Sequence, residues 1–424
     1  MSYGSYLSIS RKDKTPGGIK AERQHHVITH NPQSFQPPGM LLVVIPKLAY
    51  GDLIVPNTMK LAFNLNITGS TDAWFVNNIA ANLIQRLVIK WGGKVLLDID
   101  NYYLFETYKD LWLTSNQRID LIRRGISEIN VRKLRSNASS ASTTNSSDNR
   151  INKIYGNKYE ILLNDCSFLT DQHPFYPYIY KEQIEYDIYF NPQNLVIDKT
   201  TAADSSNYNL TNITFEYDTV YEPALCNIIT QLSDSQGGIS YLYDYVTYIG
   251  MNPINKSDTS FSLDVKHPRK SIKGILMLFE IPPTEGSRDS ENFYCPEISR
   301  VDITLDGKAN RIFEQGYLQD QQYTEAQKLC LKQIQKGLNT SDMTCNKFYG
   351  DANNAKFCLW IDCRSSEDNN LHGSGHRLMS SNNGFLIQVT KNNTGSGAIN
   401  VHTYLIADAQ FTLINRLATD PQFE

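Results

Sequence analysis

The sequence predicts an all-β protein made of two consecutive jelly-roll β-sandwich domains, each with one short helix in a loop. Two observations favour this fold. Residues 84–94 read IQRLVIKWGGK and residues 298–308 read ISRVDITLDGK, so nearly the same stretch occurs twice, 214 positions apart in a chain of 424 residues. The composition, with 25 Tyr, 17 Phe and abundant Asn, Ser and Thr, favours strands and turns over helices.

The repeated stretch has the pattern of a strand that enters a tight hairpin turn. Five positions are identical in both copies: Ile84/Ile298, Arg86/Arg300, Ile89/Ile303, Gly93/Gly307 and Lys94/Lys308. Gly-Gly and Asp-Gly pairs supply the positive φ angles that a two-residue hairpin turn requires. We therefore expect structural turns at these residues: Gly92, Gly93, Lys94, Asp306, Gly307 and Lys308.

The segments that flank the two copies recur in the same order. Strands are expected in the first half at 40–45, 60–65, 159–165, 183–190 and 213–221. In the second half they are expected at 245–250, 276–281, 356–362, 384–390 and 404–414. An amphipathic helix is expected in each half, at 116–124 and at 324–336, with Thr324 as the second helix's N-cap. Six to eight strands per half suit a two-sheet antiparallel sandwich of the jelly-roll kind.

Three segments follow from this order. Residues 1–36 have few large apolar residues and are expected to form an N-terminal arm. Residues 37–225 form the first predicted jelly roll and residues 226–424 the second, since strand signals pause after Glu222 and Pro223. The polar, low-complexity residues 136–149 account for the greater length between helix and strand in the first half and are expected to form a solvated loop.

Composition limits the classes of protein that the chain can belong to. The net charge of −4 and the pI of about 6.1 do not fit a strongly basic polyanion-binding protein. The beginning of the chain has no signal-peptide pattern, and no stretch approaches the roughly 20 apolar residues of a membrane span. Seven cysteines without CxxC spacing favour reduced thiols, so we expect a soluble protein made in the cytosol.

No catalytic, cofactor-binding or metal-binding residues are predicted, and no cofactor is expected. His25, His26 and His30 lack a matching carboxylate or Cys, which favours a solvated or interface segment over a zinc site. Asp98 and Asp100 alternate at a strand end, a pattern typical of a solvent-facing edge rather than a cation site. Gly92-Gly93-Lys94 lacks the other residues of a phosphate loop, and residues 373–376 (GSGH) have no visible catalytic partner. The chain is therefore not predicted to be an enzyme.

Two basic segments remain open to interpretation. The arm carries Arg11, Lys12, Lys14, Lys20 and Arg23, which we treat as a candidate assembly contact. Residues 117–135 carry Arg118, Arg123, Arg124, Arg132, Lys133 and Arg135. Neither segment is interleaved with aromatic residues for base stacking. Each can be a solvated face, a contact with acidic surfaces of neighbouring subunits, or a contact with packaged DNA.

Several of these residues also carry a family resemblance. In the second half these are KSIKGILMLF (270–279), the block from Phe293 to Tyr317, and the Tyr-Thr-Glu-Ala at 323–326. In the first half they are VPNTMKLAFNL (55–65) and the segment 76–98. The chain resembles, from about residue 40 to 420, the hexon-like double jelly-roll major capsid proteins of adintoviruses and Polinton/Maverick elements, relatives of adenovirus hexon.

The resemblance implies a structural role. It implies a major capsid protein that forms pseudo-hexameric homotrimeric capsomers in the icosahedral shell of a double-stranded DNA virus. Its partners would be neighbouring capsomers, penton and minor capsid proteins, and packaged DNA through the basic segments. The protein would be located in the virion after synthesis in the host cytoplasm, with the nucleus as one site of assembly. A carbohydrate-binding double β-sandwich is the alternative, and a glycan-cleaving enzyme with paired carboxylates is a third reading.

Overall fold

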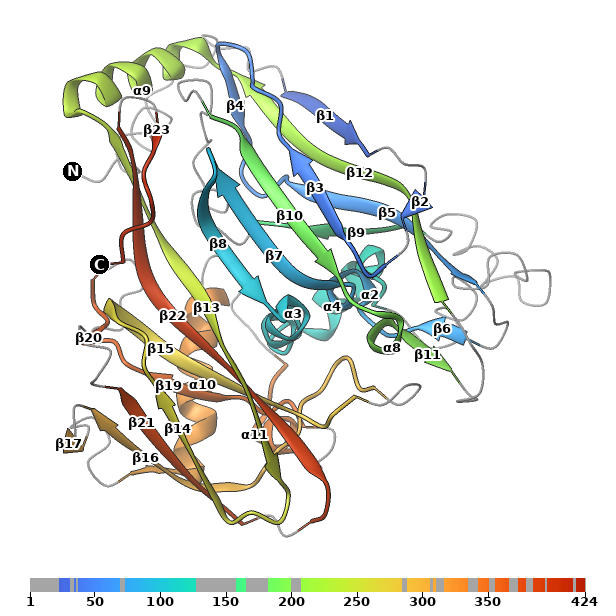
Figure 1. Cartoon of the computed structure of the whole chain (residues 1–424), viewed down its shortest axis with the longest axis vertical. Coiled ribbons are helices and arrows are strands. Elements are labelled where there is room, and N and C mark those ends of the chain that lie inside the picture. The colour runs from blue at the N-terminus through green and yellow to red at the C-terminus, as the bar shows by residue number, and fades with distance from the viewer. Residues whose placement is uncertain are drawn as a thin grey trace.

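The structure is a computed structural model that describes sixteen stretches of the chain. These are residues 23–30, 34–35, 37–68, 73–126, 158–164, 182–199, 207–283, 288–305, 308–309, 316–334, 342–350, 355–365, 373–378, 384–392, 395–414 and 417–423. The arm residues Arg11, Lys12, Lys14 and Lys20, the 136–149 loop and the turn residues Asp306 and Gly307 lie outside the described residues. Figure 1 shows the first half of the chain at the upper right and the second half at the lower left.

The first half forms a sandwich of two antiparallel sheets. One sheet has the order β1 (Arg23–Thr29), β12 (Asn207–Tyr221), β5 (Lys60–Thr68), β9 (Lys158–Leu162), with β2 (Ser34–Phe35) and β4 (Asp52–Ile54) also on β12. The other has the order β3 (Met40–Val44), β10 (Ile184–Phe190), β7 (Ile84–Trp91), β8 (Lys94–Asp100). Tyr186 of β10 and Phe215 of β12 join the layers, with ring centroids 4.9 Å apart. A short pair, β6 (Ala73–Phe75) and β11 (Ile197–Lys199), lies beside them.

The second half forms a sandwich of the same kind. One sheet has the order β13 (Ile239–Asn255), β22 (Ala398–Ile414), β15 (Arg269–Glu280), β19 (Leu359–Asp362), with β20 (His376–Leu378) on β15 and β23 (Leu417–Ala418) on β22. The other has the order β14 (Ser260–Val265), β21 (Phe385–Lys391), β16 (Ile298–Leu305), β17 (Lys308–Ala309), with β18 (Tyr317–Leu318) on β16. Phe261 of β14 and Phe279 of β15 pack across the two layers, with ring centroids 6.4 Å apart.

The two halves share one topology. The order β1-β12-β5-β9 recurs as β13-β22-β15-β19, and β3-β10-β7-β8 recurs as β14-β21-β16-β17. The five pairs of strands that the sequence aligned after residue 60 therefore occupy equivalent places, including the repeated β7 and β16. The internal duplication predicted from the sequence is confirmed, as is the mostly β fold.

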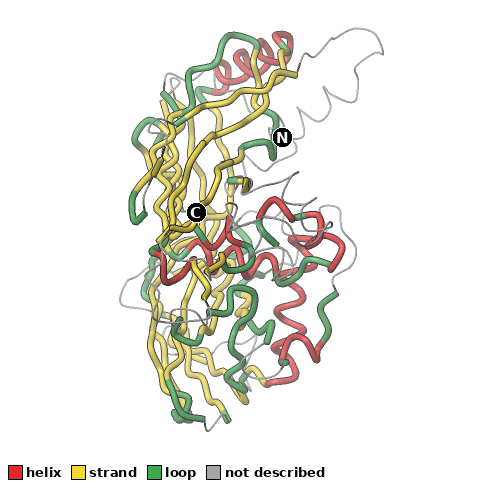
Figure 2. Tube along the Cα trace, turned by 90° about the vertical axis from the view of Figure 1, so that its right-hand side faces the viewer, coloured by secondary structure: helices red, strands yellow, loops and turns green. Residues whose placement is uncertain are grey.

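Helices are more numerous than the one per half that we expected. The described residues hold α2 (Ile79–Asn82), α3 (Tyr102–Asp110), α4 (Ser115–Asp120), α8 (Gln193–Val196), α9 (Pro223–Gln236), α10 (Gln319–Ile334) and α11 (Cys345–Tyr349), with a 3₁₀ turn η1 (Ile122–Arg124). The two expected helices correspond to α4 with η1 and to α10. Helix α10 begins at Gln319, so Thr324 lies inside it and is not an N-cap. Figure 2 shows most helices gathered on one side of the molecule and the strands on the other.

Helix α9 occupies the segment where the sequence signals for strands paused. Proline at the first helical position and Gly237 after the last one, with φ of 71°, are helix start and stop signals. The pause in the strand signals of this segment indicated only a domain boundary. Helix α3 was missed for a different reason: its sequence, YYLFETYKD, is rich in aromatic residues that favour strands elsewhere, but here nearly every residue is buried by tertiary packing.

Strand β1 is a second difference from the sequence-based expectation. Residues 23–29, which we expected to belong to a separate arm, pair along their whole length with β12. The expected strands 40–45 and 245–250, which the sequence suggested as the early strands of the two halves, are not equivalent to each other. They are strands β3 and part of β13, but β3 is equivalent to β14, and β13 is equivalent to β1.

The first predicted hairpin has the expected turn geometry. Trp91 pairs with Lys94, and Gly92 and Gly93 between them have φ values of 55° and 77°. A Cβ atom on Gly92 would lie 2.0 Å from the side chain of Glu182, whereas a Cβ on Gly93 would meet nothing within 4 Å. In the second copy Leu305 pairs with Lys308.

Replacing Gly93 by Val tests the turn without a steric clash from neighbouring residues. We expect Gly93→Val to lower the free energy of unfolding by about 1–3 kcal/mol, because a β-branched residue is strained at positive φ. Gly93→Asn is the matched control and should lose less, since Asn tolerates this conformation. Thermal melts compare the two. Equal losses for Val and Asn would contradict the assignment of a hairpin turn to Gly93. A loss from Gly93→Val no larger than the loss from shortening the 136–149 loop would contradict it as well. Because the turn is repeated in the second half, Gly307→Val should destabilise the protein as Gly93→Val does.

Candidate assembly surfaces

The two halves of the chain meet where β8 of the first half lies beside β13 of the second. Asp98 and Thr247 pair in a parallel bridge. It joins four strands of the first half to four strands of the second, and with β20 and β23 at the side they form one ten-stranded sheet. Two buried tyrosines of the second half donate hydrogen bonds to first-half carbonyls: Tyr243 to Leu96 at 2.7 Å and Tyr404 to Asn101 at 2.9 Å. The contact between the halves is therefore part of the continuous sheet and core.

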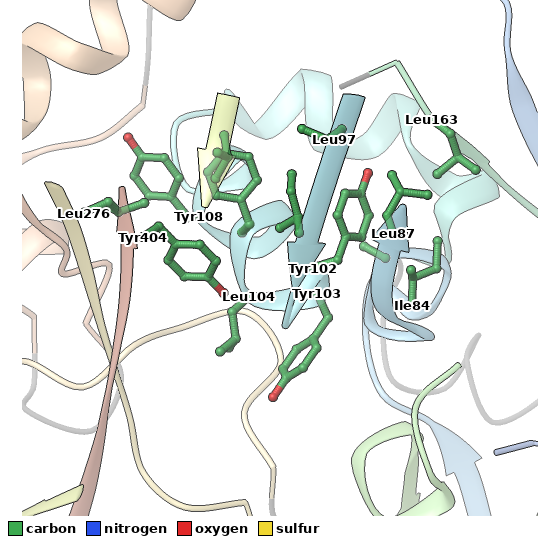
Figure 3. Packing of buried hydrophobic residues seen from close by; sticks show 14 of the residues in the cluster. Ile84, Leu87, Leu97, Tyr102, Tyr103, Leu104, Tyr108, Leu163, Leu276 and Tyr404 are labelled. Carbon is green, nitrogen blue, oxygen red and sulfur yellow. The ribbon is translucent and has the colours of Figure 1, made fainter. Parts of the chain in front are cut away.

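Helix α3 completes this junction with aromatic packing. Figure 3 shows Tyr404 and Leu276 of the second half close to Leu104 and Tyr108 of α3. Phe105 of α3 packs on Tyr404, with ring centroids 5.6 Å apart. All five side chains are buried. Burial of this aromatic cluster removes apolar surface of both halves from water and stabilises their arrangement.

A buried polar network centred on Arg288 also bridges the halves. Its guanidinium donates to Asn82 Oδ1 at 2.7 Å and to the carbonyl of Leu195, both in the first half. It also lies 4.6 Å from the ring centroid of Tyr103, a cation–π contact. Its Nε lies 3.6 Å from Glu280 of β15. Burial raises the pKa of Tyr103, and the nearby Glu280 carboxylate adds to that rise.

From Glu280 the network continues to His402 and Tyr248, within the second half. His402 Nε2 lies 3.4 Å from Glu280 Oε2, and His402 Nδ1 is hydrogen-bonded to the hydroxyl of Tyr248 at 3.0 Å. Arg288, Glu280 and His402 side chains are all less than 10% exposed. No local sequence motif marks these residues, because they come from separate strands and loops and meet only in the folded structure.

The basic segment 117–135 is not a free cationic patch where it is described. Arg118 pairs with Glu291 of the second half, Arg123 with Glu160 at 2.9 Å, and Arg124 with Asp110 at 2.7 Å and Glu106 at 3.3 Å. These arginines are thus neutralised within the chain. Arg132, Lys133 and Arg135 lie outside the described residues.

The histidines at the beginning of the chain do not converge. Neighbouring residues of a strand point to opposite faces, so His25 and His26 of β1 diverge. His25 bonds to Asp218 at 2.7 Å, whereas His26 stacks on Tyr217 and bonds to Thr219 at 2.7 Å. Within the described part of the chain, no three His, Cys, Asp or Glu side chains are grouped where they could hold a metal ion.

Arg23, the one assembly-arm residue that the structure describes, also lies in β1. Its Nε donates to Asp218 at 2.7 Å. Partial burial acts to raise the pKa of Asp218, but the hydrogen bonds from His25 and Arg23 outweigh burial and lower it. A lowered carboxyl pKa means that these contacts stabilise β1 at neutral pH and lose that contribution as the pH falls through the folded-state pKa.

The two other polar motifs singled out in the sequence are tied to neighbouring strands. Asp98 accepts two hydrogen bonds from Arg86, at 2.7 and 2.6 Å, so the acid at the strand end is ion-paired. In the 373–376 segment, Gly373 N–H donates to the buried Asp408 at 3.0 Å and Gly375 N–H to Ser271 at 2.9 Å. Both motifs therefore fix loops and strands of the sandwiches in place.

The structure of the chain is similar to several solved protein structures. No protein-family model and no curated protein sequence matches the chain. It is similar to a chain of the Sputnik virophage structure, with a TM-score of 0.59 and 10% identity over 97% of this chain and 90% of that one. It is similar to the mavirus major capsid protein, with a TM-score of 0.55 and 10% identity over 100% and 95%. It is also similar to a chain of the PBCV-1 virus capsid, with a TM-score of 0.57 and 10% identity over 96% and 98%.

These similarities cover 90% or more of each chain and establish the fold. The chain has the double jelly-roll fold that the sequence predicted. Within the described residues, no helix has both the length and the apolar character needed to cross a membrane.

The Arg288 network yields a prediction about stability. Replacing Arg288 by Met leaves Glu280 and Asn82 buried without their cationic partner, so we expect the free energy of unfolding to fall by about 3–5 kcal/mol. The matched control is Arg123→Met, which removes the exposed pair with Glu160 and should cost at most about 1 kcal/mol. Chemical denaturation measures both. Equal losses would contradict a structural role of the network at the junction.

Proposed function

We propose that the protein is a structural major capsid protein that assembles as a homotrimer into pseudo-hexameric capsomers of an icosahedral double-stranded DNA virus shell. The observation that carries the proposal is the duplication: two sandwiches of identical strand order are joined edge to edge in one chain. Three such chains supply six similar units, which give a near-hexagonal outline that can tile a surface. The end-to-end similarity to the mavirus major capsid protein supports the same role.

The proposed role also implies a location, a set of partners and a viral group. We propose that the chain acts in the virion, contacts neighbouring capsomers and penton or minor capsid proteins, and belongs to the adintovirus and Polinton/Maverick group of hexon-like proteins. We also propose that the chain is synthesised in the host cytoplasm, that shells assemble in the nucleus, and that the chain contacts packaged DNA. The proposed units are residues 37–225 and 226–424. Strand β1 extends the first unit toward the N-terminus, so the arm that we now propose ends before Arg23.

Among the described residues, no contact specifically supports either alternative function. A carbohydrate-binding double sandwich would share the fold and would remain a monomer that does not assemble. A glycan-cleaving enzyme needs two carboxylates about 5–10 Å apart across a cleft, one of them protonated. We propose that the protein has no enzymatic activity.

The oligomeric state tests the proposal. The purified protein should be a trimer of about 145 kDa, three times the 48.2 kDa of one chain. Light scattering at micromolar concentration measures this mass. A stable monomer or an even-numbered oligomer would contradict the proposed capsomer.

The arm gives a separate prediction about shell assembly. A chain that lacks residues 1–20 loses Arg11, Lys12, Lys14 and Lys20 but keeps β1, so it should still fold and form trimers. We expect it to form fewer shells than the full chain at low salt, and we expect this difference to shrink at high salt because screening weakens contacts of exposed charges. Electron microscopy counts the shells. Equal yields at low salt would make the arm dispensable.

A further inference from the structure

Residues 417–423, which we call the strap, run back along the end of β22. Strand β15 pairs with β22 as far as Ala407, and the strap continues beside β22 beyond that point. Thr419 N–H donates to the carbonyl of Thr412 at 2.9 Å. The backbones of Gln422 and Gln410 exchange two hydrogen bonds, at 2.7 and 2.8 Å. The strap is therefore fixed to the second sandwich by its backbone.

The far end of the strap is held by an aromatic residue. The ring of Phe423 packs edge-on against Tyr245 of β13, with centroids 5.0 Å apart. Arg269 Cζ lies 3.8 Å from the centroid of Phe423, which is a cation–π contact. Both partners belong to the second sandwich, so the strap is bound there at its two ends.

Two side chains of the first sandwich contact the middle of the strap. Ala418 N–H donates to Glu182 Oε2 at 3.0 Å, and Ala418 is buried. Lys94 Nζ donates to Asp420 Oδ2 at 2.8 Å, but these two side chains are 40% and 75% exposed. An exposed ion pair stabilises little, whereas a hydrogen bond to a carboxylate is strengthened by its charge. Glu182 is therefore the main acceptor of the strap.

Glu182 lies over Gly92, which has no side chain to displace it. A Cβ atom on Gly92 would lie 2.0 Å from the carboxyl group of Glu182. The hairpin turn does not itself require glycine here, because Asp-Gly and Asn-Gly pairs form the same turn, and the second copy has Asp306 at this position. The glycine at position 92 thus makes room for the carboxylate that accepts from the strap.

The strap lies beside an aromatic contact between the two halves. Trp91, the last residue of β7, packs edge-on against Phe411 of β22, with ring centroids 5.8 Å apart. Trp91 Nε1 also donates to the carbonyl of Glu182 at 3.3 Å. Phe411 lies between Gln410 and Thr412, whose backbones bond to the strap. Glu182 therefore connects the strap to the tryptophan at the interface of the halves.

We infer that the strap fastens the hairpin turn of the first sandwich to the second sandwich, with Glu182, seated over Gly92, as its acceptor. The inference concerns a single chain and goes beyond the proposed function, because it holds whether or not copies associate. It assigns a conformational role to the C-terminal residues and to one glycine of the repeated turn.

The position of the strap explains why such a fastening matters. Within the described part of the chain, β8 and β13 are joined by one backbone bridge, between Asp98 and Thr247. A single bridge leaves the relative angle of two sheets to the contacts at either end of the strand. Tyr404 bonds to Asn101 just after β8, and the strap bonds to Lys94 at its beginning. The two ends of β8 are thus held separately.

Exchanging glycine for asparagine at positions 92 and 93 tests the acceptor. Both glycines have positive φ, 55° and 77°, which asparagine tolerates. Asparagine at 92 would displace Glu182, whereas a Cβ at 93 meets nothing within 4 Å. Hydrogen exchange of the full-length protein, read by mass spectrometry, follows the amides of residues 417–423. We expect Gly92→Asn to raise their exchange rate about tenfold and Gly93→Asn to leave it unchanged.

Variants of Glu182 separate the acceptor from the turn. Glu182→Ala removes the acceptor without changing the hairpin, so it should release the strap as Gly92→Asn does. Glu182→Gln keeps an oxygen that accepts a hydrogen bond and should restore much of the protection. If Gly92→Asn acts through Glu182, adding it to Glu182→Ala should not raise the exchange rate further.

Acrylamide quenching of tryptophan fluorescence tests whether the strap restrains the junction. All four tryptophans of the chain are buried, so quenching of the unmodified protein should be weak. Release of the strap should make the emission of Trp91, one tryptophan in four, accessible to acrylamide. Phe423→Ala removes the contact at the far end and should raise quenching as well, whereas Gly93→Asn should not.

Three results would overturn the inference. Equal exchange of residues 417–423 in Gly92→Asn and Gly93→Asn would show that Glu182 is not the acceptor that holds the strap. Additive effects of Gly92→Asn and Glu182→Ala would show that Gly92 acts on the turn alone. Faster exchange without stronger quenching would show a C-terminal segment that opens without loosening the junction.

Discussion

The edge-to-edge contact of β8 and β13 is the constraint on which the rest of the structure depends. Through it, eight principal strands from both halves form one sheet, and the tyrosines Tyr243 and Tyr404 satisfy carbonyls of the neighbouring half. Part of the aromatic face of α3 is covered by the second half, where Phe105 packs on Tyr404. Either sandwich alone would expose this surface, so the relative position of the two halves is built into their folding.

The polar groups at this junction add direction to the hydrophobic contact. Apolar burial alone tolerates sliding, since it depends on area rather than geometry. Arg288 must reach Asn82, Leu195 and Tyr103 at once, and Glu280 must lie near both Arg288 and His402. A shifted arrangement would leave buried charges without partners, which is costly. We interpret the network as the contact that sets the angle between the sandwiches.

The sequence predicted the fold better than the surfaces. The repeated strand and turn, with Gly92 and Gly93 at positive φ, allowed the order of the paired strands to be found without the structure. Strand β1 was missed because its exposed, His-rich sequence has no apolar face and gains its place from β12. Arg118 and Arg124 were read as a basic patch because their acidic partners, Glu291 and Asp110, are recognisable only in three dimensions.

The central claim is that one chain supplies two similar walls of a six-walled ring. Electron microscopy of the purified, unassembled particle tests it most directly, because class averages of end-on views report the outline and its symmetry together. The account predicts a near-hexagonal ring of six similar densities with threefold symmetry, in which alternate contacts differ slightly. Averages with a two-fold outline, or isolated pairs of densities at concentrations where the protein is fully folded, would contradict it.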